Sequence, residues 1–98
     1  MSRSLVFRSQ AALEITEAAD WYESRSRGLG SEFLRTVDAC IASIRRNPLL
    51  HPKTYSIYRR AALRRFPYGI FYTVTDDEII VVSCYHARRD PKSWRDFS

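Results

Sequence analysis

The sequence contains very little lysine, and it is also poor in glycine, proline and cysteine. Only Lys53 and Lys92 among its 16 basic residues are lysines, and the other 14 are arginines. Lysine is the basic residue whose pKa shifts readily on burial and which forms Schiff bases, so its scarcity leaves little room for lysine chemistry. Arginine holds carboxylate or phosphate through two parallel hydrogen bonds. With a net charge of +5, the bias favours a protein that binds an anionic partner.

The two cysteines, Cys40 and Cys84, are far apart in the sequence, and neither has a partner at the spacing of a zinc motif. We therefore expect two reduced thiols and no metal site. The sequence also lacks a phosphate loop, a hydrolase nucleophile elbow, a zinc-protease motif and a dinucleotide fingerprint. No cofactor is expected.

Long apolar runs are missing as well. A chain of 98 residues predicts a single domain, residues 1–98. No segment approaches the roughly 20 apolar residues that cross a bilayer, so no membrane partner is expected. Residues 1–5 run directly into polar sequence without the apolar segment of a signal peptide, which predicts a cytoplasmic protein.

The first half of the chain has helical periodicity after one short strand. Residues 5–8 alternate like a strand, and Ser9 fits the N-cap of a helix over residues 10 to about 25. Glycines at 28 and 30 end that helix, and Ser31 is predicted to cap a second helix that stops at Asn47-Pro48. Both helices have one apolar stripe, so the pattern predicts an antiparallel helical hairpin.

The second half changes to the two-residue period of strands. We predict strands over residues 60–66, 70–75 and 79–86, joined by turns at 67–69 and 76–78. Short turns between consecutive strands predict a three-stranded antiparallel meander. The fold class expected is therefore α+β, in the order β-α-α-β-β-β, with the helices covering one face of the sheet.

Three arginine pairs stand in the strand half and the tail, at residues 59–60, 64–65 and 88–89. Any one arginine could lie on a solvated strand face and form salt bridges there. Taken together, six arginines within 31 residues favour a binding surface, and Arg60 and Arg64 are expected to share a face. Both an acidic protein segment and a nucleic acid fit such a surface. Because no nucleic-acid reading module is present, no sequence-specific nucleic-acid binding is expected.

His86 follows the most apolar stretch of the chain and precedes Arg88 and Arg89. It could be a general acid or base beside a bound phosphate, but a structural strand-end histidine is the more frequent case. The four acidic residues of the first helix are expected to form a solvated face and not a catalytic carboxylate pair: Glu14, Glu17, Asp20 and Glu23.

Several stretches, in order, resemble the RelE/ParE toxin superfamily, and in particular its ParE branch. They are Ala11–Ile15 with Trp21-Tyr22, then Arg46-Asn47-Pro48, then Arg59-Arg60 through Arg65-Phe66-Pro67-Tyr68 and Phe71-Tyr72, and last His86 through Pro91 with Trp94. The resemblance covers nearly the whole chain. It implies the toxin of a type II toxin–antitoxin (plasmid stabilisation) module, neutralised by a ParD-like antitoxin whose acidic, amphipathic tail folds on binding.

The resemblance leaves two targets open. ParE-like toxins are associated with inhibition of DNA gyrase, whereas RelE-like relatives cut mRNA on the ribosome. The strand lysines common in the RelE branch are missing here, so gyrase inhibition without enzymatic activity is the leading hypothesis and endoribonuclease activity is the alternative.

These hypotheses assign residues to three roles. If the chain is an RNase, the expected catalytic residues are His86, Tyr85, Arg60, Arg64 and Arg88. The expected antitoxin contacts are Trp21, Leu34, Arg60, Arg64, Phe71 and Arg88. The expected target contacts are Arg88, Arg89 and Trp94.

Overall fold

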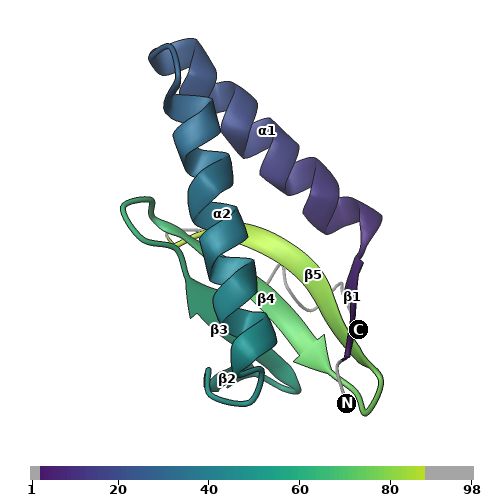
Figure 1. Cartoon of the computed structure of the whole chain (residues 1–98). Helices are drawn as coiled ribbons and strands as arrows, with labels where there is room; N and C mark the ends of the chain where they lie inside the picture. Colours follow the sequence, from purple (N-terminus) through teal and green to yellow (C-terminus); the bar gives the residue numbers. More distant parts are fainter. Residues whose placement is uncertain (1–2, 88–98) are drawn as a thin grey trace.

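A helical hairpin lies across one face of a five-stranded sheet in the computed structural model, which describes residues 3–87 (Figure 1). The elements are β1 (Ser4–Phe7), α1 (Ser9–Arg25), α2 (Leu29–Arg46), β2 (Lys53–Tyr55), β3 (Tyr58–Ala62), β4 (Tyr68–Val74) and β5 (Glu78–His86). The predicted α+β class and the order of the helices and the main strands are confirmed.

The sheet has the strand order β1-β5-β4-β3-β2. The predicted antiparallel meander is present as β3-β4-β5. The sheet as a whole is mixed, because β1 pairs with β5 in parallel. The chain between β1 and β5 contains both helices and strands β2 to β4, which provides the long connection that a parallel pair requires. Strand β2 has three residues and was not predicted, since so short a segment shows no period of two.

The first meander strand lies earlier than predicted. Strand β3 ends at Ala62, and the Leu63 N–H then donates to the Tyr68 carbonyl, which closes a turn. Arg65 lies in that turn with φ of 71°, a left-handed conformation that a strand cannot contain. The predicted strand over residues 60–66 is therefore wrong at its C-terminal end, and so is the expectation that Arg60 and Arg64 share a strand face.

Both predicted serine caps are also wrong. Arg8 and Gly28 occupy the two N-cap positions, and neither provides a side-chain cap. At α2 the carboxylate of Glu23, on the last turns of α1, accepts hydrogen bonds from the N–H groups of Gly28 and Gly30 at 3.0–3.1 Å. A carboxylate is favourable there because it pairs with helix N–H groups that have no intrahelical acceptor.

Two apolar clusters lie on opposite faces of the sheet. The larger one, between sheet and hairpin, is centred on fully buried side chains such as Phe33, Ile44, Ile70 and Tyr72. The smaller one, on the face without helices, consists of Tyr58, Phe71, Val82 and Tyr85. Alternation along β4 and β5 divides these residues between the faces. Both cysteines are buried, and they form no disulfide with each other.

Strand β5 has an irregularity that positions the site described below. Phe71 pairs with Ser83 but Tyr72 pairs with Val81, so β5 has one extra residue opposite β4. Such a bulge bends the strand and redirects the side chains beside it. None of the described helices is long and apolar enough to span a membrane.

Candidate functional site

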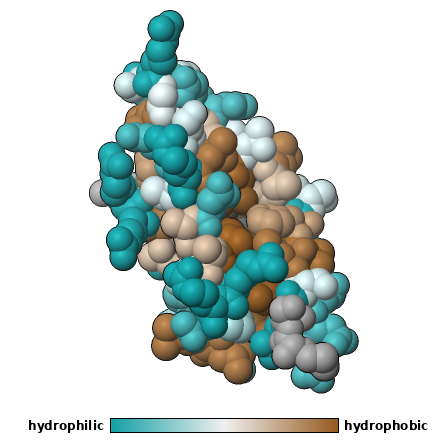
Figure 2. Space-filling view, in the orientation of Figure 1, coloured by the Kyte–Doolittle hydropathy of each residue, from teal (hydrophilic) through white to brown (hydrophobic). Residues whose placement is uncertain are grey.

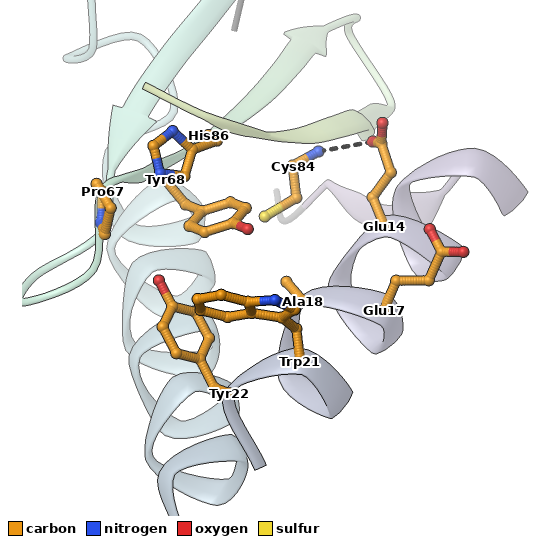
Figure 3. Close-up of a pocket in the computed structure, with 9 residues that line it drawn as sticks. All are labelled: Glu14, Glu17, Ala18, Trp21, Tyr22, Pro67, Tyr68, Cys84 and His86. Atoms are coloured by element: carbon orange, nitrogen blue, oxygen red, sulfur yellow. Dashed lines mark hydrogen bonds between the residues drawn. The ribbon is translucent and has the colours of Figure 1, made fainter. Parts of the chain in front are cut away.

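A groove of about 570 Å³ separates α1 from the C-terminal half of β5 (Figure 3). We call it the α1–β5 groove. Its walls are Glu14, Glu17, Ala18, Trp21 and Tyr22 of α1, with Pro67 of the turn before β4 and Tyr68, Cys84 and His86 of the sheet. Its size is within the range of ligand and side-chain pockets.

Glu14 joins the two walls of the groove. One carboxylate oxygen, Oε1, accepts hydrogen bonds from the Ser83 hydroxyl at 2.7 Å and from the Cys84 N–H at 3.0 Å. The bond from Cys84 is drawn in Figure 3. Ser83 is fully buried and directly follows the extra residue of the bulge. The bulge therefore presents a hydroxyl and an N–H to the same acceptor, and α1 is held against β5 at this point.

Aromatic rings form the rest of the groove. Tyr68 lies between Tyr22 and His86, with ring centroids at 6.2 and 5.1 Å respectively. Burial is the largest cause of a raised pKa at Tyr22, so its hydroxyl stays protonated at neutral pH. Trp21 is 51% exposed and has the Arg25 guanidinium 4.6 Å from its ring centroid. An exposed tryptophan beside a cavity is the kind of side chain that anchors a protein partner.

The remaining surface of this side of the molecule is divided between apolar and hydrophilic regions. Figure 2 shows apolar residues along the middle of the face and hydrophilic ones at the tip of the hairpin. Other large apolar side chains are exposed in the loop after the C-terminus of α2, where Leu49 and Leu50 are 59% and 73% exposed.

The residues predicted for RNA cleavage do not share a face. His86 pairs with Tyr68 and faces the α1–β5 groove, on the helix side of the sheet. Arg60 pairs with Phe71 and lies on the opposite face, 5.9 Å from the Phe71 ring. Tyr85 packs against Phe71 on that same helix-free face and is 5% exposed.

Arg64 is in neither place. It lies in the turn after β3 and lines a different cavity, beneath α2. The structure thus brings Arg60 and Tyr85 to one face of the sheet, places His86 on the other, and separates Arg64 from all three. Arg88 is outside the described residues.

The residues predicted for antitoxin contact are similarly dispersed. Trp21 lines the groove, and Leu34 is exposed on α2. Phe71 lies on the helix-free face of the sheet and is 1% exposed. The predicted target contacts Arg88, Arg89 and Trp94 lie outside the described residues.

Sequence reasoning missed three structural roles. The expectation of a solvated acidic face is wrong for Glu14, which is partly buried and binds β5, whereas Glu23 is exposed as expected but also binds the start of α2. The role of Glu23 could have been recognised locally, because Gly28, the N-cap of α2, follows it by five residues. Glu14 had none, because its partner Ser83 is 69 residues away. Arg59 was expected on a binding surface, but its guanidinium donates to the carbonyls of Leu49 and His51.

Within residues 3–87 no group of three or more histidine, cysteine or acidic side chains could hold a metal ion. Burial is the main cause of the raised pKa of Cys40, about 11, so this thiol is protonated at neutral pH. It donates to the Ala61 carbonyl at 3.7 Å and is not poised as a nucleophile.

Comparisons with known proteins agree with this architecture. The "Chromosomal ParDE TA system from P. aeruginosa" superposes with a TM-score of 0.66 at 17% identity, covering 89% of this chain and 98% of that one. The E. coli DinJ-YafQ toxin-antitoxin complex gives 0.59 at 13% identity, with 88% and 93% covered. The YoeB dimer from Staphylococcus aureus gives 0.56 at 20% identity, with 88% and 99% covered.

At these identities the superpositions establish the fold alone. No match is found among curated protein sequences. The model of the ParE toxin family, described as the ParE toxin of the type II toxin-antitoxin system parDE, matches residues 5–91. That match spans every described helix and strand except the first residue of β1. The chain belongs to the ParE toxin family of type II toxin–antitoxin systems.

Proposed function

We propose that this chain acts in the cytoplasm as a toxin that inhibits DNA gyrase by binding it, and that a ParD-like antitoxin neutralises it. Membership of the ParE toxin family supports the toxin role. The observation that favours binding over catalysis is the position of His86 and Arg60 on opposite faces of the sheet.

That separation matters because of what RNA cleavage requires. The general acid or base must reach the reacting oxygen at hydrogen-bond distance, and a cation must meet the same phosphate as charge develops on it. A sheet lies between His86 and Arg60, so one phosphate cannot contact both side chains. Inhibition by binding requires only a complementary surface, which an arginine-rich chain provides.

We place the antitoxin at the α1–β5 groove. An apolar side chain of the antitoxin would lie against Trp21, Tyr22 and Tyr68, as in helix-in-groove recognition. Glu14 and Glu17 disfavour an acidic side chain within the groove itself. The acidic residues of the antitoxin would instead meet the exposed arginines on the hairpin, including Arg25 beside Trp21.

The target is tested with purified toxin, DNA gyrase and relaxed plasmid. We expect inhibited supercoiling or trapped cleaved DNA, reversed by the co-encoded antitoxin. The same preparation is added to a translating extract, and His86→Ala is the comparison. Absence of any effect on gyrase at excess toxin, together with mRNA cleavage that His86→Ala abolishes, would replace this proposal with the endoribonuclease.

The antitoxin site is tested with two apolar truncations on the same helix. Trp21→Ala should weaken antitoxin binding at least about ten-fold, as expected for a central aromatic anchor. Leu13→Ala is the matched control, since Leu13 is 57% exposed on α1 but does not line the groove. Equal affinities for the two variants would exclude the groove as the antitoxin site.

A further inference from the structure

A second cavity, of about 310 Å³, lies between α2 and the end of β3. We call it the α2–β3 pocket. It is separate from the α1–β5 groove and shares no lining residue with it. Its lining consists of Thr36, Ala39, Cys40, Ser43 and Arg46 of α2, with His51, Ala62 and Arg64.

The charges around this pocket are of one sign. Arg46 and Arg64 are both exposed, so they stand at its mouth, and the lining contains no carboxylate. Among the described residues, neither arginine forms an ion pair, and the only salt bridge joins Arg65 to Glu32. The one ionisable acid inside, the Cys40 thiol, remains neutral because burial raises its pKa to about 11. Two arginines therefore line this pocket, and none of its described lining residues carries a negative charge.

His51 forms part of the inner wall of the pocket. Its Nε2 atom is buried and has no hydrogen-bond partner in the part of the chain that the structure describes. The residue is fixed in place, because its carbonyl accepts a hydrogen bond from the Arg59 guanidinium at 2.7 Å. Its ring also packs edge-on against the Tyr72 ring, with the centroids 6.2 Å apart. Because Nε2 is inaccessible to solvent, it does not face the open part of the pocket, and the imidazole is a fixed group beside the cavity.

We propose that the α2–β3 pocket binds a phosphate group. Arg46 and Arg64 hold its oxygens through their forked N–H donors. The Ser43 hydroxyl offers a further donor to the same group. The volume exceeds that of a phosphate ion, so a phosphate ester also fits, with the rest of the molecule extending past the two arginines.

The test uses the chain's two histidines as reporters. Inorganic phosphate is titrated into the purified protein while the imidazole nitrogen signals are followed by NMR. We expect saturable shifts at His51 and none at His86, which lies in the α1–β5 groove. Parallel titrations with a nucleoside 5′-monophosphate and with the uncharged nucleoside distinguish the sources. Tighter binding of the nucleotide than of inorganic phosphate identifies a nucleotide site, and equal binding identifies a site for the phosphate group alone.

Charge-neutralising variants show whether the pocket, and not general surface charge, is responsible. Arg46→Gln and Arg64→Gln should each weaken phosphate binding about ten-fold or more. Arg45→Gln is the matched control, because it removes the same charge from the adjacent exposed position on α2 outside the pocket. The proposal is overturned if His51 does not respond, if His86 shifts equally, or if Arg45→Gln weakens binding as much as the other two.

Discussion

Replacing Glu14 by alanine should lower the stability of the fold far more than its position on an acidic helix face implies. The substitution removes one oxygen that accepts two hydrogen bonds, from the Ser83 hydroxyl at 2.7 Å and the Cys84 N–H at 3.0 Å. Hydrogen bonds to a charged acceptor contribute roughly 1.5–3 kcal/mol each, and burial of the donors makes their loss costly. Because Glu14 is itself partly exposed, we expect a combined loss of about 2–3 kcal/mol.

The assay is urea unfolding followed by circular dichroism, with thermal unfolding in parallel. For a domain of 98 residues this loss corresponds to a fall in Tm of about 10–20 °C. Glu17→Ala is the control, because Glu17 also lines the α1–β5 groove but forms no hydrogen bond among the described residues. That variant should stay within about 0.5 kcal/mol of the native protein.

A double-mutant cycle with Ser83→Ala isolates the contact itself. The Glu14–Ser83 hydrogen bond should appear as a coupling energy of about 1–2 kcal/mol, since directly bonded side chains are not additive. A coupling energy near zero, or equal stabilities for Glu14→Ala and Glu17→Ala, would refute the inference that Glu14 holds α1 against β5. The groove would then depend on apolar packing alone.

Three further predictions concern the packing that supports the site. Gly30→Ala should destabilise the fold by about 2 kcal/mol in urea unfolding, because a Cβ there would lie 2.5 Å from the Ala19 carbonyl oxygen. Cys40 has its pKa raised from 9.0 to about 11, so its stabilising contribution is complete below pH 9 and is lost as pH rises towards 11. Between pH 8 and 10 the free energy of unfolding should therefore fall more steeply with pH for the native protein than for Cys40→Ala. Identical slopes for the two proteins would contradict this. Arg65→Val should cost about 1–2 kcal/mol, because a β-branched residue disfavours its φ of 71°, whereas Arg64→Val should be nearly neutral in thermal unfolding.

The amphipathic periodicity in this sequence was strong enough to predict the two helices and the three central strands. Each of those elements shows its pattern within about ten residues, and local steric preference and burial of one face are sufficient to select it. The errors fell where the pattern is short or where two rules compete. Lys53–Tyr55 is too short to show a period. Residues 60–66 alternate like one strand, yet the left-handed Arg65 ends it early.

Local sequence patterns are sufficient to predict the fold class and the helical hairpin, and the excess of arginine indicates an anionic partner. Which of these residues come into contact depends on the tertiary structure. In the folded chain Arg60 and His86 lie on opposite faces of the sheet. The Arg59 guanidinium donates to the carbonyl of His51 in the loop after α2, and Glu14 contacts Ser83, which is 69 positions away in the sequence. The reason is that the face on which a strand residue lies depends on strand register, and one extra residue in β5 changes that register for every residue after it.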